Sequence, residues 1–345
     1  MSAISIRSVR KEFKGHQALK SIDLEVKDRE FCVLLGPSGC GKTTLMRIIA
    51  GLEEATDGEV WIGDRRVDAL PPRQRRIAMV FQNYAVFPHM TISQNIGFGL
   101  LMQKKPADEI KRQVGRAAEL MHINHLLDRY AGQLSGGQRQ RVAVARALAV
   151  QPDVLLMDEP LSNLDALLRL EMRSELKGLL RDIETTTLYV THDQTEAMSL
   201  GDRIAVMHGG EIVQYDVPSA VYNQPANQFV GSFIGNPPMN FITDPVVQAV
   251  LGCTAPQAGM TLGVRPESLE LVNTSAGGPA GLGVDAKVVE MLGASQQVNT
   301  KVGEQLMRIS LPAEPVIPAG ARLQLRAKPG SARWYDGQGR LQAVA

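Results

Sequence analysis

Short hydrophobic runs alternate with longer amphipathic stretches through the first two thirds of the chain. Mostly apolar runs of this kind are typical of strands buried on both faces of a parallel sheet. They lie at residues 30–35, 77–81, 154–157, 187–190 and 203–207. A predominantly helical block at about 90–150 separates the second run from the third. We therefore predict an α/β domain with a largely parallel sheet.

The pattern changes after Gly235-Asn236-Pro237-Pro238. Glycine, proline and short alternating segments such as residues 285–290 follow, with turn residues at close intervals. A length of 345 residues also favours about two domains. We expect an α/β domain over residues 1–235 and a small all-β domain over residues 236–345, without internal repeats.

Composition excludes several classes of protein. Lys plus Arg number 37 and Asp plus Glu 36, and this balance argues against a protein that coats nucleic acid. Three cysteines without CxxC spacing argue against a disulfide framework or a structural zinc site and suit a reducing cytosol. No apolar run is long enough to span a bilayer, and the N-terminus has no signal-like apolar region, so we expect the mature chain to begin near Met1.

Residues 77–103 contain no Asp, Glu, Lys or Arg, although 21% of the chain is charged. Polar residues and a proline interrupt this stretch, so it is unsuited to a hydrocarbon core. The residues themselves leave two alternatives open, ordinary core or an interface with another protein.

A phosphate-binding motif follows the first apolar run directly. Residues 36–43, GPSGCGKT, fit the pattern GxxxxGK[ST] between a strand and a helix. Glycines let backbone amides curl around a phosphate, Lys42 reaches the β and γ phosphates, and the Thr43 hydroxyl ligates Mg²⁺. The predicted nucleotide-binding residues are Gly36, Pro37, Ser38, Gly39, Cys40, Gly41, Lys42, Thr43 and Thr44.

Two adjacent carboxylates end the apolar run at 154–157. Asp158 is placed to hold the magnesium shell, and Glu159 to act as general base on the attacking water. Acidic pairs at strand ends are common, so the phosphate loop is what makes this pair significant.

A second phosphate-type helix N-terminus lies at Leu134-Ser135-Gly136-Gly137-Gln138, with Ser135 as N-cap. One nucleotide does not need two such cradles. Here the sequence resembles the ATP-binding cassette (ABC) family, in which this signature of one subunit closes over the γ-phosphate bound by the other. A P-loop small-molecule kinase would lack it.

The resemblance runs over nearly the whole chain and implies further roles. Gln82 matches the glutamine that reaches Mg²⁺, Asp165 belongs to the D-loop Ser162-Asn163-Leu164-Asp165, and His192 matches the switch histidine that contacts the γ-phosphate. The second D-loop position is more often alanine, and we expect no consequence from Asn163. Phe13 takes the place of the aromatic residue that stacks on adenine, with a core aromatic as the alternative.

Flanking sequences are similar to the importer subfamily typified by the maltose-importer ATPase. They are residues 84–92, 94–100, 191–198, 233–241 and the TOBE-like mark Gly263-Val264-Arg265-Pro266-Glu267. The resemblance implies a RecA-like core with antiparallel β and helical subdomains, then an OB-like domain. It also implies ATP and Mg²⁺ as ligands and a homodimer on the cytoplasmic face of the inner membrane.

The implied partners are two permease subunits contacted through about residues 82–100 and, indirectly, a periplasmic or lipoprotein substrate-binding protein. A sugar or sugar derivative is the expected cargo. ATPases of iron, polyamine, sulfate or phosphonate importers remain alternatives, as does a soluble non-transport ABC ATPase. An OB-like domain raises RNA binding, but the chain has no basic, aromatic stacking stripe, so we expect no nucleic-acid partner.

Overall fold

The computed structural model describes residues 2–272 and 281–342. It divides into two compact units, Met1–Pro218 and Ser219–Ala345. This boundary lies earlier than the predicted one at 236, because residues 219–235 bond to the second unit: Arg265 donates to the carbonyls of Tyr222, Gly231 and Ile234.

The first unit is built on a six-stranded sheet with the order β10-β9-β3-β8-β7-β6, parallel except for β10. All five predicted strands are present. The strands are β3 (Phe31–Leu35), β6 (Ile77–Val80), β7 (Val154–Asp158), β8 (Thr186–Thr191), β9 (Arg203–His208) and β10 (Glu211–Asp216). β3 and β8 are buried at every position, as expected for central strands of a covered parallel sheet.

A second, antiparallel sheet has the order β2-β1-β4-β5. Its strands are β1 (Ile4–Phe13), β2 (His16–Val26), β4 (Asp57–Ile62) and β5 (Arg65–Arg66). Helix α1 (Lys42–Ala50) shares one hydrophobic core with both sheets, through residues such as Leu45, Val60 and Leu156. The helix that follows the phosphate loop is therefore fixed from two sides.

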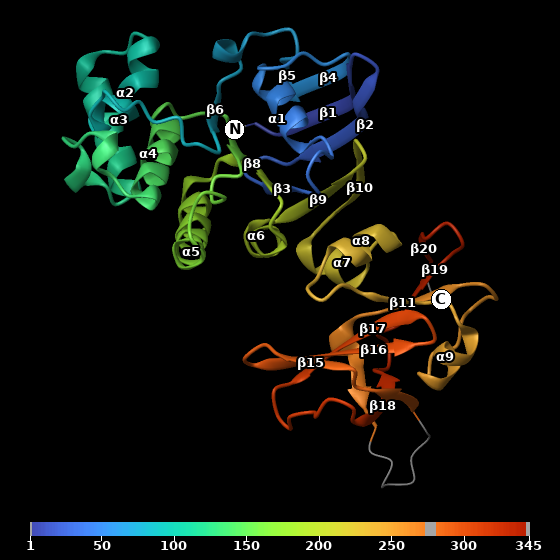
Figure 1. Ribbon diagram of the computed structural model, residues 1–345. Helices are drawn as coiled ribbons and strands as arrows, with labels where there is room; N and C mark the ends of the chain where they lie inside the picture. Colours follow the sequence, from blue (N-terminus) through green and yellow to red (C-terminus); the bar gives the residue numbers. More distant parts are fainter. Residues whose placement is uncertain (1, 273–280, 343–345) are drawn as a thin grey trace. The chain divides into compact units, whose positions relative to one another are not determined.

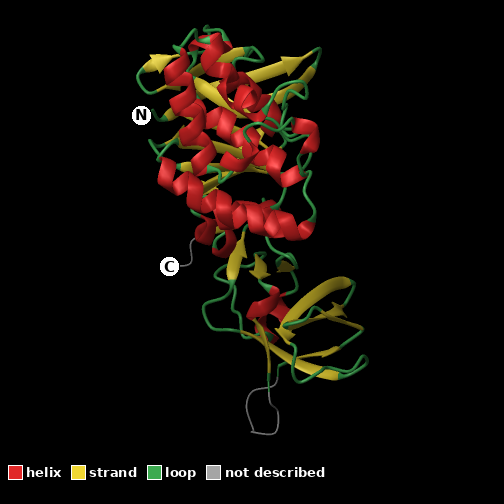
Figure 2. Ribbon diagram, turned by 90° about the vertical axis from the view of Figure 1, so that its left-hand side faces the viewer, coloured by secondary structure: helices red, strands yellow, loops and turns green. Residues whose placement is uncertain are grey.

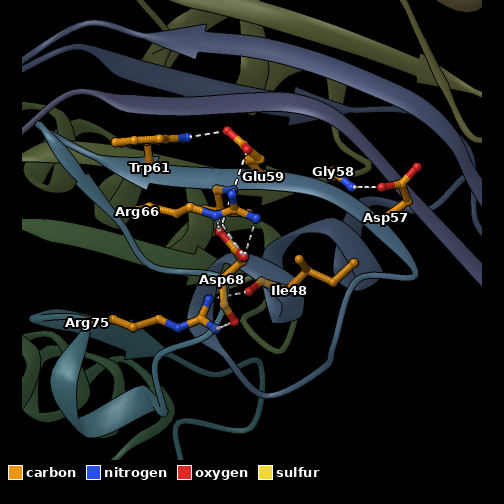
Figure 3. A network of polar contacts seen from close by, with 9 residues as sticks. Ile48, Asp57, Gly58, Glu59, Trp61, Arg66, Asp68 and Arg75 are labelled. Carbon is orange, nitrogen blue, oxygen red and sulfur yellow. Dashed lines mark hydrogen bonds and ion pairs between the residues drawn. The ribbon is translucent and has the colours of Figure 1, made fainter.

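Arg75 caps the C-terminal end of α1 (Figure 3). Its guanidinium donates to the carbonyls of Ile48 and Ile49 at 2.6 and 2.9 Å and to those of Asp68 and Leu70 at 2.9 and 2.8 Å. A cation at this end also complements the helix dipole. Burial lowers the pKa of Arg75, and the neighbouring Asp68 opposes that change.

The predicted helical block forms a cluster of three helices (Figure 1). They are α2 (Ile92–Met102), α3 (Ala107–Leu120) and α4 (Gly136–Ala149). Short 3₁₀ turns at Asn124–Leu126 and Ala131–Gln133 join α3 to α4. Two more helices, α5 (Ala166–Ile183) and α6 (Gln194–Leu200), complete the crossovers, and a 3₁₀ turn at Pro72–Gln74 precedes β6.

The second unit consists mainly of strands (Figure 2) in three small sheets, β11-β12-β19-β20, β13-β18-β14 and β15-β16-β17. Its strands are β11 (Asn240–Ile242), β12 (Thr261–Val264), β13 (Leu269–Leu271), β14 (Leu282–Asp285), β15 (Val288–Met291), β16 (Ser295–Val302), β17 (Gln305–Pro312), β18 (Arg322–Ala327), β19 (Arg333–Tyr335) and β20 (Leu341–Gln342).

Short helices accompany these strands: α7 (Pro218–Asn223), α8 (Gln228–Phe233), α9 (Pro245–Val250) and a 3₁₀ turn at Pro266–Ser268. The strand predicted at 285–290 is interrupted after Asp285. There Ala286 donates its N–H to the Ala321 carbonyl and Lys287 donates to Asn299, so the chain passes from one sheet to another. One hydrophobic core, which includes Leu262, Val298 and Trp334, joins the sheets.

Candidate functional site

The phosphate loop connects the end of β3 to α1 and curls around the amino group of Lys42. Lys42 Nζ donates to the carbonyls of Gly36 and Pro37 at 2.8 and 2.9 Å, and the lysine is 5% exposed. The lysine ammonium therefore lies within the curl of the loop.

Two glycines of the loop are required by their surroundings. A Cβ atom on Gly36 would lie 2.3 Å from the carbonyl oxygen of Met207. Gly41 has φ 107°, and a Cβ there would lie 2.6 Å from the Leu19 side chain. The loop therefore offers main-chain atoms rather than side chains, as a phosphate cradle needs.

Asp158 ends β7 beside the start of α1. Burial raises the pKa of its carboxyl group, and the charge of Glu159 adds to that effect; the charges of Arg47 and Lys42 and a hydrogen bond with Thr43 oppose it. The Asp158 carboxylate and the Thr43 hydroxyl thus lie together, and oxygen ligands of this kind suit Mg²⁺. The structure brings these two predicted metal ligands into one site.

Glu159 and His192 are also brought together, from the ends of β7 and β8. His192 Nδ1 lies 3.1 Å from Glu159 Oε2. Glu159 has φ 43°, an unusual conformation for a residue with a Cβ, and its N–H donates to the Val190 carbonyl at 3.0 Å. The hydrogen bond to β8 therefore stabilises this unusual backbone conformation at Glu159, the candidate base, where the chain leaves β7.

A buried carboxylate supports the loop that carries His192. Glu196 Oε2 accepts from the Tyr189 and Thr191 hydroxyls at 2.9 and 2.8 Å. Thr191 in turn accepts from the N–H of Asp193, whose carboxylate caps α6. Burial raises the pKa of Glu196. These contacts place His192 between two fixed residues.

The signature segment forms the N-terminus of α4 through a capping box. Ser135 Oγ accepts from the Gln138 N–H at 3.3 Å, and Gln138 Oε1 accepts from the Ser135 N–H at 3.1 Å. Gly136 and Gly137 occupy the first helical turn, where N–H groups have no intrahelical acceptor. A Cβ on Gly137 would press on Leu168 of α5 at 3.1 Å, so this glycine also permits packing.

The described part of the chain shows no hydrogen bond or ion pair that joins Ser135–Gln138 to Lys42, Asp158, Glu159 or His192. The signature segment thus has no direct polar contact with these four residues among the described residues. Phe13 lies at the end of β1, 41% exposed, with the Lys11 ammonium 4.6 Å from its ring centre. Asp165 caps α5 by accepting from the Leu168 N–H at 2.9 Å.

The sequence analysis gave no role to three residues near the site: it noted Asn163 but expected no consequence from it, and it did not single out Arg169 or Arg146. Asn163 Nδ2 donates to the carbonyl of Gln82 at 2.7 Å, a contact that alanine could not make. Arg169 donates to the carbonyls of Ser162 and Leu164 and lies 3.9 Å from Asp193. Arg146 bonds to residues 84 and 85. For Asn163 a signal existed, since it departs from the usual alanine; the two arginines had none.

A groove of about 860 Å³ runs along the uncharged stretch. Ile77, Phe81, Phe98 and Leu100 contribute apolar walls, and Arg73, Arg76 and Arg146 contribute cations. Residues 84–91, the second part of the loop between β6 and α2, are called the groove loop. Phe87 of this loop lines the groove, whereas the Tyr84 side chain is 6% exposed and does not.

Comparison with known proteins places these features in a family. Residues 19–162 match the model for the family described as ABC transporter. The chain is 45% identical to the sn-glycerol-3-phosphate import ATP-binding protein UgpC of Ralstonia nicotianae, over the full length of both. It is 43% identical to the sulfoquinovosyl glycerol transport ATP-binding protein SmoE of Agrobacterium fabrum, over 97% of this chain and 98% of that one.

The chain belongs to the ABC transporter family. Among solved structures it is similar to the dimeric post-hydrolysis state of the ATP-binding cassette MJ0796 bound to ADP and Pi. The TM-score is 0.56 and the identity 31%, over 62% of this chain and 98% of that one. The family and this fold make the chain an ABC-type ATPase. None of the helices in residues 2–272 and 281–342 is long and apolar enough to cross a membrane.

Proposed function

We propose that this ABC ATPase energises a bacterial importer for a sugar or sugar derivative, as a peripheral subunit on the cytoplasmic face of the plasma membrane. Relatives alike over their whole length are named for the import or transport of sn-glycerol-3-phosphate and of sulfoquinovosyl glycerol. The observation that carries the proposal is the combination of a phosphate loop, a Glu159–His192 pair and a second, separate helix N-terminus at Ser135.

In the proposed reaction, the amides of the phosphate loop and Lys42 bind the β and γ phosphates of ATP. Thr43, Asp158 and Gln82 would hold Mg²⁺, which would neutralise phosphate charge. Glu159 takes a proton from the attacking water as general base. His192, 3.1 Å from Glu159, positions that carboxylate and contacts the γ-phosphate.

We infer that two copies of the chain share each nucleotide. Lys42, Asp158, Glu159 and His192 come from one subunit, and Ser135–Gln138 come from the other. The lack of a direct polar contact between the signature and the other four residues in the described part of one chain supports this arrangement, because a helix N-terminus acts on an anion only at close range. Closure of the dimer would then complete each site and drive the permease between its two states.

The groove supports the inference of a permease contact. It lies between the helical cluster and the edge of the parallel sheet at β6, and Phe87 and Phe98 pack there with ring centres 4.7 Å apart. An apolar groove with a cationic rim suits an amphipathic helix of a partner. We place the contact with each permease subunit in this groove, within residues 82–100.

Mixed dimers test the shared site. A Lys42→Ala subunit paired with a Ser135→Arg subunit, purified through two different tags, should contain one site with both lesions and one intact site. It should therefore occlude about one nucleotide per dimer, whereas either mutant homodimer occludes none. A mixed dimer with no competent site would contradict sharing between subunits. The same result would arise if both sites must be intact to act, and single-turnover binding of ATP distinguishes these two explanations.

The importer role has its own test. The chain is purified with the permease encoded beside it, and ATP turnover is measured with and without the neighbouring binding protein loaded with candidate ligands. Stimulation by a loaded binding protein supports the proposal. Turnover that never responds to a permease contradicts it.

A further inference from the structure

Arg146 connects the groove loop to the helix that begins at the signature. Its Nη1 donates to the Ala85 carbonyl at 2.6 Å, and its Nη2 donates to the Tyr84 carbonyl at 2.9 Å. The guanidinium carbon also lies 5.5 Å from the ring centre of Phe87. Three residues of the groove loop, Tyr84, Ala85 and Phe87, thus contact the Arg146 side chain.

The backbone of the groove loop needs such a partner. Tyr84 and Ala85 have φ values of 63° and 46°, and two consecutive residues with a Cβ in the left-handed region are energetically costly. The far end of the loop is held by Asn95, whose Nδ2 donates to the Phe87 carbonyl at 3.1 Å and whose Oδ1 accepts from the Phe87 N–H at 2.8 Å. Arg146 holds the near end.

Arg146 makes no ion pair in the described part of the chain, and burial lowers its pKa. Its charge therefore acts on backbone carbonyls and an aromatic face alone. Arg146 reaches the two carbonyls with two separate nitrogens of one planar guanidinium, whereas a lysine would have to reach both from its single Nζ and has no planar group to lie beside the Phe87 ring. A lysine at this position is thus a sharp test of the geometry.

Arg146 and the signature belong to one rigid element. Helix α4 begins at Gly136 directly after Ser135, and Arg146 lies within the same continuous helix, about 16 Å along its axis. We infer that Arg146 is a positioning residue that makes the groove loop and Ser135–Gln138 move together. Whatever displaces the loop in the groove then displaces the signature relative to the phosphate loop of the opposite subunit. This inference rests on the proposed function, since it assigns the route by which the permease groove and the nucleotide communicate.

The first test needs no permease. Hydrogen exchange of residues 84–91 is measured in the full chain with Glu159→Gln, which retains MgATP, in the presence and absence of MgATP. Nucleotide should change exchange in the loop when Arg146 is present. Arg146→Lys should raise basal exchange there about tenfold, because charge-assisted bonds are lost, and should abolish the response to nucleotide.

Arg141→Lys is the matched control. Arg141 lies on the same helix and donates to both carboxylate oxygens of Glu175 at 2.8 and 2.6 Å, away from the groove loop. It should preserve the response of the loop. Two results would overturn the inference. One is hydrogen exchange in the groove loop that does not change with MgATP in the parent chain; the other is an equal loss of that response in the Arg141→Lys protein.

The second test uses the assembled importer. Co-purification with the permease should persist in Arg146→Lys, while the ratio of permease-stimulated to basal turnover should fall about tenfold relative to Arg141→Lys. An unchanged ratio would overturn the role of Arg146. If the parent chain itself neither binds nor responds to a permease, the importer proposal fails, and the exchange experiment still decides whether loop and signature are linked.

Discussion

Asn163 of the D-loop donates a hydrogen bond from Nδ2 to the main-chain carbonyl of Gln82 at 2.7 Å. The two residues come from loops that follow different strands, β7 and β6, which are neighbours in the parallel sheet. The Asn163 side chain therefore connects the D-loop to Gln82, the candidate magnesium-binding glutamine. From the family resemblance alone, we expected asparagine and alanine to be equivalent at this position.

We predict that Asn163→Ala lowers kcat by about two- to tenfold and raises the Mg²⁺ concentration needed for half-maximal turnover. The loss of one neutral hydrogen bond accounts for that size. Steady-state ATP turnover over a range of Mg²⁺ concentrations measures both effects. Asn163→Asp, which has no N–H to donate, should behave alike, and unchanged magnesium dependence in both proteins would contradict the role.

Glu159→Gln should bind ATP but lose hydrolysis by about 10²- to 10⁴-fold, because an amide keeps the shape of the carboxylate without accepting a proton. Nucleotide binding and single-turnover hydrolysis measure the two properties separately. Glu175→Gln, a change of the same kind at an exposed residue of α5 that pairs with Arg141, is the control and should keep turnover. Near-parental hydrolysis by the Glu159 variant would remove Glu159 from the role of base.

Phe87→Asp should uncouple ATP hydrolysis from transport, because Phe87 lines the groove and packs on Phe98. A charge there would require desolvation on contact with a partner helix. Co-purification with the permease and uptake per ATP hydrolysed measure the effect. Normal values for both would exclude this surface from the permease contact.

Tyr84→Phe should instead affect stability. The Tyr84 hydroxyl is buried and has no hydrogen-bond partner among the residues that the structure describes, and burial raises the pKa of Tyr84. Removal of the hydroxyl should therefore leave the free energy of unfolding unchanged or raise it by about 1 kcal/mol. Urea denaturation of the full chain measures this, and a clear loss of stability would reveal a partner for the hydroxyl.

Arg75→Met should destabilise the protein by about 3 kcal/mol, since four backbone carbonyls lose a charged donor that is 3% exposed. Urea denaturation again provides the measurement. Arg66→Met is the control, because Arg66 pairs with Glu59 and Asp68 at the surface of the same network and should matter far less. Equal losses would contradict a specific role at the end of α1.

The sequence by itself determined the parallel sheet, the helical block and the individual motifs. These features are local: each apolar run marks a buried strand, and each motif lies within a few residues of a strand end or helix start. Lys42 could be assigned from the phosphate-loop motif and Asp158 from its place at the end of a buried strand, whereas the role of His192 came from the resemblance to the family. The role of Ser135 as N-cap could also be predicted, because its partner Gln138 is only three residues away.

Tertiary structure decided what connects these parts. Arg146, Asn163 and Arg169 bond to backbone carbonyls, and carbonyl positions depend on the path of the chain rather than on residue type. Tyr84 is buried and does not line the groove, and its left-handed backbone conformation was not indicated by any sequence pattern. The boundary between the two units lies at Pro218 rather than at the predicted residue 236. Arg265, far along the chain, bonds to residues 222–234 and so ties them to the second unit. Such contacts exist only once distant segments have packed together.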